Sequence, residues 1–333
     1  SGGWAIGCAT SKSKKIGITG CAGFIGSNLA ESLVENNKIT GLDNYLTGKK
    51  ENMTDFFDHP NFTFIEGDIC DPDTCEEAAR NTDVIMHQAA LGSVPRSIKN
   101  PIPTNEINVS GFLNMLIAAK ENNIKRFVYA SSSSVYGDHP DLPKTEDNIG
   151  KPLSPYAVSK YTNEVYAEVF SRLYGIETIG LRYFNVFGKR QDPDGPYAAV
   201  IPKFIKKLIK KEQPIIHGDG SQSRDFTYID NVVRINQLAA ITQNKNAINQ
   251  VYNVAYGEQT NLNEMYQILI ALLSGLSEDI KNIKPQFGPP RPGDIPHSLA
   301  SISKAQNLLN YNPRYGIKKG LEKSIRWYWE NLQ

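Results

Sequence analysis

The stretch Lys15-Ile-Gly-Ile-Thr19-Gly20-Cys-Ala-Gly23-Phe-Ile-Gly26 places a short apolar run directly before a turn that contains three glycines. After the turn, apolar residues recur at the spacing of a helix face, at Ile25, Leu29 and Leu33. Small residues in such a turn let the backbone approach a pyrophosphate, and the start of the following helix offers free N–H groups and a positive dipole to that anion. The stretch therefore predicts an α/β fold that begins with a dinucleotide-binding unit.

A carboxylate at the end of the second expected strand supports this interpretation. The run 39–43 ends in Asp43, about twenty residues after the glycine turn begins, where an acidic residue meets the ribose hydroxyls of a bound dinucleotide. A carboxylate there repels a 2′-phosphate, and no arginine follows it directly. NAD is therefore predicted in preference to NADP, and a merely tight turn is the simpler alternative.

Strands and helices continue to alternate along the chain. Strands are expected at 62–68, 84–90 and 126–131, and one of the helices between them at 108–121. This alternation is typical of a doubly wound parallel sheet, the Rossmann arrangement. His87 lies in an apolar strand, so we interpret it as a packed core residue and not as a base. In the C-terminal part, helices are expected at 201–211 and 262–273, short strands at 215–217 and 251–255, and a core-docking helix around Trp327, Tyr328 and Trp329.

Tyr156 and Lys160 are the candidate catalytic pair. They lie in Leu153-Ser-Pro-Tyr-Ala-Val-Ser-Lys160, where the proline suits the first turn of a helix, so both side chains share one face. An ammonium held near a phenol favours the phenolate and lowers the phenol pKa, which predicts a base near neutral pH. The cluster Ser131-Ser-Ser-Ser134 follows the fifth strand at the edge of the sheet where ligands bind. A hydroxyl of this cluster is expected to bond the substrate oxygen that Tyr156 deprotonates.

The composition argues against several classes of partner. Lys and Arg number 36 against 35 for Asp and Glu, so no basic field attracts nucleic acid or anionic lipid. No apolar run reaches about 18 residues, and residues 1–10 lack the charged start and long apolar centre of a secretion signal. The four cysteines form neither a paired ligand pattern nor a dense disulfide scaffold. A cytoplasmic location is therefore expected, and no metal site is predicted.

The glycine turn, Asp43, the serine cluster and the Tyr156/Lys160 pair together resemble the extended short-chain dehydrogenase/reductases, and specifically the UDP-hexose 4-epimerases. The resemblance extends from Lys14 to the C-terminus. Further motifs that carry it are Asp43-Asn-Tyr-Leu-Thr-Gly48, Asn108-Val-Ser-Gly111, Leu181-Arg-Tyr-Phe-Asn185-Val-Phe-Gly188, Ser223-Arg-Asp-Phe-Thr-Tyr228 and Arg291-Pro-Gly-Asp294.

The resemblance implies the domain organisation. It implies an NAD-binding Rossmann domain over 14–183, which includes the catalytic helix, and a smaller C-terminal α/β domain over 184–333 that mainly binds the nucleotide sugar. Exchange of chain segments between the two is an open alternative. Residues 1–13 are expected to be a disordered or vector-derived extension. A homodimer formed through helices near 108–121 and 156–174 is the expected assembly.

The resemblance also implies roles for individual residues. The expected catalytic residues are Ser132, Ser133, Tyr156 and Lys160. The residues expected to bind NAD are Gly20, Gly23, Phe24, Ile25, Gly26, Asp43, Asn44, Thr47, Gly48, Asp68, Ile69, Gln88, Ala89, Ala90, Asn108, Tyr156, Lys160 and Tyr183. The residues expected to bind the UDP-sugar are Gly92, Ser93, Ser132, Ser133, Ser134, Asn185, Gln191, Ala199, Val200, Arg224, Arg291, Asp294 and Ser298. Arg224 and Arg291 are assigned to its diphosphate, because a guanidinium fork matches phosphate oxygens.

The residues after the catalytic hydroxyl distinguish the reactions within the family. Counting back four from Tyr136 places Ser132 at that hydroxyl. In the related 4,6-dehydratases an Asp and a Glu follow it, and decarboxylases also carry a Glu, whereas this chain has Ser133 and Ser134. Elimination then lacks a positioned acid and base, so reversible epimerisation at C4, an isomerase reaction, is predicted. A nucleotide-sugar reductase or dehydratase and a dinucleotide sensor without turnover are the alternatives.

The preferred sugar is predicted from three positions. The resemblance places Ser298 at the pocket wall, where epimerases restricted to UDP-glucose and UDP-galactose carry a tyrosine, and a serine leaves room for an acetamido group. Gly92-Ser93 and Gln191 also resemble the N-acetyl-preferring subgroup. UDP-GlcNAc and UDP-GalNAc are therefore the predicted pair, with UDP-N-acetylhexosaminuronates and with UDP-glucose and UDP-galactose as alternatives.

Overall fold

The computed structural model describes residues 13–333 of the chain, so the extension expected at 1–13 lies, apart from Ser13, outside the described residues. Its centre is a sheet of seven strands in the order β11-β6-β5-β4-β1-β2-β3, and every neighbouring pair is parallel. The strands are β1 (Lys15–Thr19), β2 (Lys38–Asp43), β3 (Phe62–Glu66), β4 (Val84–His87), β5 (Arg126–Ser132), β6 (Glu177–Tyr183) and β11 (Gln250–Val254). This topology confirms the predicted doubly wound parallel sheet.

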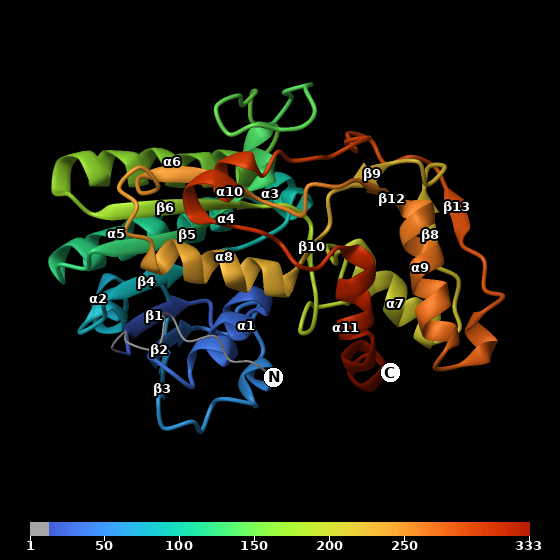
Figure 1. Cartoon of the computed structure of the whole chain (residues 1–333), viewed down its shortest axis with the longest axis horizontal. Coiled ribbons are helices and arrows are strands. Elements are labelled where there is room, and N and C mark those ends of the chain that lie inside the picture. The colour runs from blue at the N-terminus through green and yellow to red at the C-terminus, as the bar shows by residue number, and fades with distance from the viewer. Residues whose placement is uncertain (1–12) are drawn as a thin grey trace.

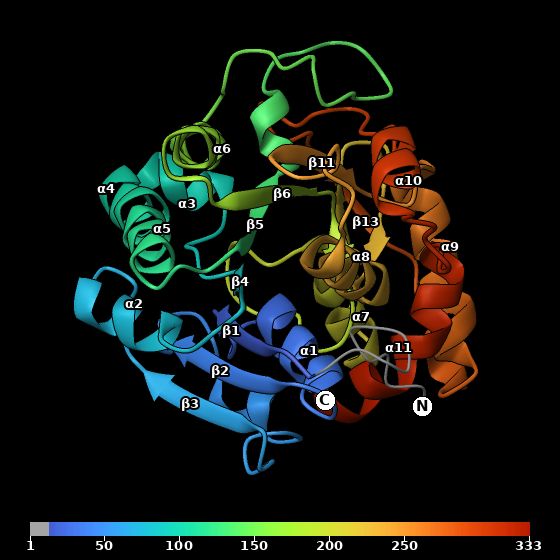
Figure 2. The same ribbon diagram turned by 60° about the vertical axis from the view of Figure 1, so that its left-hand side comes forward.

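Helices cover both faces of the sheet (Figure 1). Figure 2 shows α2, α5 and α6 on one face and α1 and α8 on the other. Phe112 and Leu116 pack in one apolar cluster with Phe127 of β5, and Leu29 packs in a second cluster with Ile18 of β1. A sheet covered on both faces explains why its strands read as continuous apolar runs. The bounds of these helices are α1 (Phe24–Leu33), α2 (Pro72–Ala79), α5 (Phe112–Glu121), α6 (Pro155–Tyr174) and α8 (Ile229–Ile241).

His87, at the end of β4, is a core residue, as predicted. It is 3% exposed, its ring stacks on Phe127, and its Nδ1 lies 2.8 Å from Oγ1 of Thr19. Burial lowers the pKa of His87 to about 3, so the imidazole is neutral at physiological pH.

The C-terminal part forms a smaller assembly of helices and two-stranded pairs beside the sheet (Figure 1). The pairs are β7 with β10, β9 with β12 and β8 with β13. Tyr328 in α11 is fully buried, and Trp327 and Trp329 pack against the same apolar cluster, which confirms the core-docking helix. The elements are α7 (Val200–Ile209), α9 (Leu262–Ser274), α10 (Ser303–Leu309), α11 (Ile317–Asn331), β7 (Val186–Phe187), β8 (Ile215–His217), β9 (Ser223–Arg224), β10 (Thr227–Tyr228), β12 (Thr260–Asn261) and β13 (Gln286–Gly288).

Strand β11 connects the two parts of the chain. It follows more than sixty residues of the C-terminal half, yet it pairs with β6 in the central sheet, where Val254 lies opposite Tyr183. The helix before it, α8, covers the same sheet (Figure 2). The chain therefore crosses from the sheet to the smaller assembly at Phe184 and returns to the sheet before leaving it again.

Some element boundaries differ from those expected. The third and fourth strands end at Glu66 and His87, before the polar residues of the adjoining loops. The helix expected at 108–121 begins as a π-helix (Glu106–Gly111) and becomes α-helical only at Phe112. Before it stand the short helices α3 (Val94–Lys99) and α4 (Pro101–Asn105). Prolines near the start of each explain why this segment breaks into short pieces.

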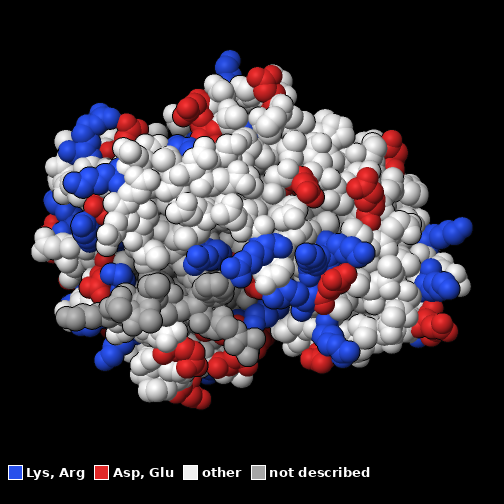
Figure 3. Space-filling model, in the orientation of Figure 1, with Lys and Arg blue, Asp and Glu red and all other residues white. Residues whose placement is uncertain are grey.

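Charges of both signs are spread over the surface. On the face in Figure 3, Lys and Arg gather above α8 and α11, and acidic side chains lie among them and around the rim. This distribution agrees with the net charge of +1. None of the helices within residues 13–333 has the length and apolar character that crossing a bilayer requires.

Asn108, in the π-helix, joins three segments near the edge of the sheet. It is 1% exposed. Its Oδ1 accepts the N–H of Leu91 at 2.7 Å, and its Nδ2 donates to the carbonyl of Leu91 at 3.0 Å and to Oγ of Ser159 at 3.1 Å. The π-helical widening thus places one amide where it satisfies both backbone groups of Leu91.

The substitution Asn108→Leu keeps the number and branching of the side-chain heavy atoms but leaves both backbone groups of Leu91 buried without partners. We expect the free energy of unfolding, measured by urea unfolding followed by circular dichroism, to fall by about 2–4 kcal/mol. Asn246→Ala, at an exposed asparagine, is the control and should stay within about 0.5 kcal/mol of the parent protein. A similarly small change for Asn108→Leu would show that the amide contributes nothing to the fold.

Candidate active site

The glycine turn between β1 and α1 is built for close backbone approach. Gly20 has a φ of +74°, which favours glycine. A Cβ on Gly26 would lie 2.0 Å from the carbonyl oxygen of Gly20, so only glycine allows α1 to start against the turn. Helix α1 has Gly23 as its N-cap residue, no side-chain cap and no acidic residue in its first turn. Its first N–H groups are therefore available to an anion.

Asp43 is held at the end of β2 beside this turn. Its Oδ2 accepts the N–H of Ala22 at 2.9 Å and its Oδ1 accepts the N–H of Tyr45 at 2.8 Å. Each carboxylate oxygen keeps a further lone pair, which suits a pair of ribose hydroxyls. The fixed carboxylate and the glycine turn fit the adenosine end of a dinucleotide.

A pocket above the carboxyl ends of β1, β2 and β4 gathers most of the residues expected to bind the cofactor. They are Gly20, Gly23, Asp43, Asn44, Thr47, Gly48, Asp68, Ile69, Gln88, Ala89 and Ala90. Deeper in the sheet, Tyr183 donates to Oε1 of Gln88 at 2.9 Å and accepts from Nδ2 of Asn236 at 3.1 Å. These bonds fix the Gln88 side chain at the wall of the pocket.

Lys160 is buried and only distantly associated with the Tyr156 ring. It is 3% exposed, its Nζ donates to the carbonyl of Ala130 at 3.1 Å, and Nζ lies 5.9 Å from the centre of the Tyr156 ring. Burial lowers the pKa of Lys160 to about 8. The ammonium is thus oriented by the end of β5.

The expectation of a lowered phenol pKa is wrong for this structure. Desolvation raises the pKa of Tyr156, and a hydrogen bond with Ser132 opposes that rise without cancelling it. The sequence places Lys160 on the same helix face, but Nζ is directed to the Ala130 carbonyl and does not overcome the effect of burial.

The serine cluster divides into structural and available hydroxyls. Ser131 donates to Oε2 of Glu164 at 2.6 Å, which makes it part of the fold. Ser132 accepts the N–H of Ser134 at 3.1 Å and keeps its hydroxyl hydrogen for Tyr156 or a ligand. Ser133 and Ser134 begin a 3-10 helix (Ser133–Tyr136), and Oγ of Ser134 is buried with no hydrogen-bond partner among residues 13–333.

Ser97 is a site residue whose role the sequence analysis missed. Its Oγ accepts the N–H of Tyr156 at 3.0 Å and itself donates to the carbonyl of Val94 at 2.7 Å. The hydroxyl thereby fixes the start of α6 against α3. No pattern in the chain signals this contact, because the two residues are far apart in sequence.

A second pocket adjoins the first at the start of α1. Gly23, Phe24 and Thr47 form one side, and the predicted substrate residues Gly92, Ser93, Gln191 and Ala199 line it as well. Nε2 of Gln191 donates to the carbonyl of Val186 at 2.9 Å. Its Oε1 is buried and has no donor among residues 13–333, which leaves an acceptor for a ligand.

A third pocket contains Arg291 and Asp294. His217, Gln222 and Phe287, which the sequence analysis did not select, line it as well. Nη2 of Arg224 pairs with Oδ1 of Asp294 at 2.9 Å, so these three predicted residues lie together.

Asn185, Val200 and Ser298 line none of these three pockets. The side chain of Asn185 is exposed, and its φ is +40°. Val200 is the first residue of α7. The N–H of Ser298 donates to the carbonyl of Ser223 at 3.1 Å, which places Ser298 next to Arg224.

Comparisons with known proteins agree with this geometry. Residues 16–255 match the NAD dependent epimerase/dehydratase family. A UDP-N-acetylglucosamine 4-epimerase of Methanobrevibacter ruminantium M1, in complex with UDP-N-acetylmuramic acid, is 40% identical, with a TM-score of 0.87 over 96% of this chain and 98% of that one.

Two further solved structures are similar over nearly their whole length. A UDP-glucuronic acid 4-epimerase of Bacillus cereus, with UDP-glucuronic acid and NAD, is 34% identical, with a TM-score of 0.85 over 95% of this chain and 99% of that one. A UDP-glucose 4-epimerase of Thermotoga maritima, with UDP-glucose, is 33% identical, with a TM-score of 0.87 over 96% of this chain and 100% of that one. The chain therefore belongs to the NAD dependent epimerase/dehydratase family, among its UDP-sugar 4-epimerases, and is an isomerase with NAD as its cofactor.

Proposed function

We propose that this enzyme interconverts UDP-GlcNAc and UDP-GalNAc by inverting C4 of the sugar. The observation that carries the choice of sugar is Oε1 of Gln191: the residue lines a ligand pocket, and this buried acceptor has no donor among residues 13–333. An acetamido N–H is a donor that a plain hexose lacks at C2, and it would satisfy this acceptor. The small side chain of Ser298 supports the same choice.

The residues around Tyr156 supply the acid–base chemistry. Residues such as Gly20, Asp43 and Gln88 would hold NAD, which when bound would supply the hydride acceptor and donor for C4. Tyr156 takes the O4 proton as the C4–H bond breaks, so the alcohol becomes a ketone. The hydroxyl of Ser132 donates a hydrogen bond to the reacting oxygen, and buried Lys160 stabilises the phenolate by its charge. After the keto sugar has turned its other face to the cofactor, Tyr156 returns the proton to O4, with no net redox change.

The surroundings of Ser132 favour epimerisation over elimination. The 3-10 helix Ser133–Tyr136 that follows it presents two serine hydroxyls and no carboxylate. The nearby Glu164 already accepts hydrogen bonds from Ser131 and from Arg182 at 2.6–2.9 Å. Water loss from the sugar needs a positioned acid and base, and this segment supplies neither.

An acidic amino sugar, such as a UDP-N-acetylhexosaminuronate, is the second candidate substrate, and Arg96 favours it. Of the charged residues that line the second pocket, Lys49, Arg190, Asp192 and Asp194 are in ion pairs. Arg96 instead donates to the carbonyl of Gly92 at 3.2 Å and lies over the Tyr197 ring at 5.0 Å. Its remaining N–H groups suit a carboxylate, and the M. ruminantium relative was solved with UDP-N-acetylmuramic acid.

We also propose a homodimer, with NAD bound mainly by residues 14–183 and the sugar nucleotide mainly by 184–333. Exposed apolar side chains on α6 and on the adjoining helices α3 and α4 support the dimer: Leu173 of α6 is 65% exposed, Ile98 of α3 60% and Ile102 of α4 67%. Large apolar side chains left exposed on neighbouring helices are typical of a subunit interface. The described cysteines are free thiols, which is compatible with the proposed cytoplasmic location.

Proton NMR of the C4 configuration tests the reaction directly. Protein supplied with NAD and UDP-GlcNAc should form UDP-GalNAc with no net change in reduced cofactor. Tyr156→Phe removes only the ionisable hydroxyl, so it should retain NAD and the fold while turnover falls by at least about a hundredfold. If the variant turns over normally, Tyr156 is not the base; if the parent protein leaves every UDP-hexose unchanged, the proposed reaction is wrong.

The role of Lys160 is tested by the pH dependence of turnover. Removing the ammonium in Lys160→Met should raise the pKa of Tyr156 further, because the phenolate loses a neighbouring positive charge. In a plot of kcat against pH, the acid limb should therefore move to higher pH. Activity near pH 7 should fall more than activity near pH 9. The exposed Lys211→Met serves as the control. An unshifted acid limb in Lys160→Met would show that the lysine does not act on the phenol.

The choice of sugar is tested by Ser298→Tyr. A ring at this position should exclude the acetamido group, so kcat/KM for UDP-GlcNAc should fall by at least about tenfold, while that for UDP-galactose is retained. Ser303→Tyr, the same change at an exposed position in α10, should alter neither value. Equal losses for both sugars in Ser298→Tyr would show that this residue supports the fold and does not select the substrate.

A further inference from the structure

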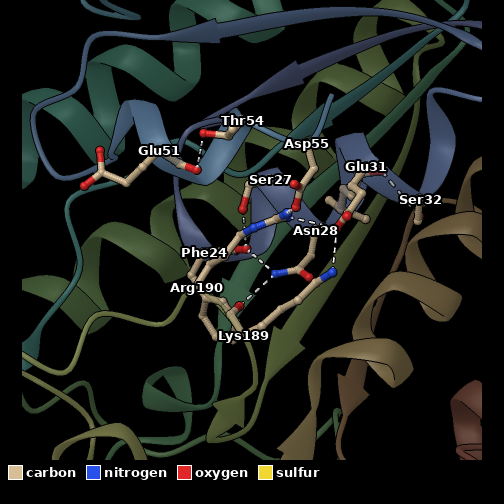
Figure 4. Close-up of polar contacts among 11 residues, drawn as sticks. Phe24, Ser27, Asn28, Glu31, Ser32, Glu51, Thr54, Asp55, Lys189 and Arg190 are labelled. Atoms are coloured by element: carbon tan, nitrogen blue, oxygen red, sulfur yellow. Dashed lines mark hydrogen bonds and ion pairs between the residues drawn. The ribbon is translucent and has the colours of Figure 1, made fainter. Parts of the chain in front are cut away.

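A group of charges around the buried Arg190 fastens the segment before Gln191 to helix α1 and to Asp55. Nη2 of Arg190 donates to Oδ2 of Asp55 at 2.8 Å, and Nη1 lies 3.0 Å from Oε2 of Glu31 in an ion pair that lacks hydrogen-bond geometry. The Arg190 side chain is 4% exposed. Nζ of Lys189 pairs with the same Glu31 oxygen at 2.7 Å. Figure 4 shows both basic side chains directed at α1.

The backbone of the loop is held as well. Nδ2 of Asn28 donates to the carbonyl of Lys189 at 3.1 Å and to that of Phe24 at 2.8 Å (Figure 4). From the opposite side, the Tyr328 hydroxyl donates to the carbonyl of Gly188 at 2.9 Å. Arg190 has a φ of +74°, a left-handed conformation that a non-glycine residue adopts only when its surroundings impose it.

This attachment joins two walls of one pocket. Gly23 and Phe24, at the start of α1, form the wall next to the cofactor, and the loop from Gln191 to Ala199 forms the facing wall. Those walls come from residues more than 160 positions apart in sequence, and Arg190 immediately precedes the loop. A shift of this loop by about 1 Å would move the acceptor of Gln191 out of reach of the sugar.

We infer that Arg190 is a positioning residue: with Glu31 and Asp55 it sets the distance between the cofactor wall and the sugar wall of the second pocket. The identity of the sugar rests on the proposed function, whereas the attachment itself does not. A guanidinium fork suits this task because it spans two carboxylates on different segments, which a single ammonium does not.

The charges around Arg190 make its removal tolerable for folding. Glu31 keeps its pair with Lys189, and the Asp55 side chain is 66% exposed, so neither carboxylate would be buried without a partner. In Arg190→Met the apolar stem is kept. The variant should fold and bind NAD, with the loop held to α1 only by the contacts of Lys189 with Glu31 and Asn28.

The matched control is Arg126→Met. Arg126 is a similarly buried arginine that pairs with Glu177 at 2.7 Å and also donates to the carbonyl of Ala239 at 2.6 Å, at the amino end of β5, away from the pockets. Both variants should lower the melting temperature. Only Arg190→Met should raise the KM for the UDP-sugar, by about tenfold to a hundredfold, with kcat reduced much less and bound NAD unchanged. Arg190→Lys keeps the positive charge, so its KM should lie between that of the parent protein and that of Arg190→Met.

Hydrogen exchange of the NAD-bound protein gives a readout that does not depend on turnover. Amide exchange in residues 191–199 should become faster in Arg190→Met and stay at the parent rate in Arg126→Met, and the Kd for UDP-GlcNAc should rise only in the former. Parent-like exchange in 191–199, or a KM rise no larger than that of Arg126→Met, would overturn the inference. If the parent protein epimerises no UDP-sugar, the proposed function fails, while amide exchange in residues 191–199 still decides the role of Arg190.

Discussion

The bidentate ion pair between Arg182 and Glu164 holds the catalytic helix on the sheet, and the site depends on it. Arg182 in β6 donates to both oxygens of Glu164 in α6, at 2.9 and 2.7 Å. Burying two charged side chains costs desolvation energy, which is offset only when both groups have all their hydrogen-bond partners. Here Ser131, the Tyr136 hydroxyl and the Glu146 carbonyl complete it. Because Glu164 lies one turn beyond Lys160, the same bonds fix Tyr156 and Lys160 over the end of β5.

The polar network continues from this pair into the C-terminal half of the chain. The Tyr136 hydroxyl donates to Oδ1 of Asn253 at 2.5 Å, and Asn253 belongs to β11, the strand that pairs with β6. Hydrogen bonds therefore link the serine cluster after β5, helix α6 and strand β11 into one network. A change in how β11 packs would reach Ser131, the residue before Ser132, through these contacts, although β11 itself touches none of the three pockets.

The sequence was informative where local chemistry decides the structure. Apolar runs marked the parallel strands, and the glycines of the first turn marked a place where the backbone is left free of side chains. Contacts between distant residues gave no such signal: Ser97 with Tyr156, and Arg190 with Glu31 and Asp55, depend on how the segments pack. The direction of the Tyr156 pKa shift was mispredicted for a related reason, because spacing reveals a neighbouring charge but not the burial that outweighs it. The return of β11 to the central sheet was likewise not visible in the sequence, because its apolar pattern fits a strand in either part of the chain.

The position of β11 also affects how the protein is made. During synthesis the ribosome completes β6 at Tyr183, but its neighbour at the sheet edge, Gln250–Val254, is added only some seventy residues later. Until then β6 presents an open row of backbone N–H and C=O groups, a surface that pairs readily with another nascent chain. A truncated product that stops before Gln250 keeps this open edge permanently. The enzyme's sheet thus gains its last strand late in translation, and until β11 pairs with β6 the growing chain exposes the backbone of β6 to other chains.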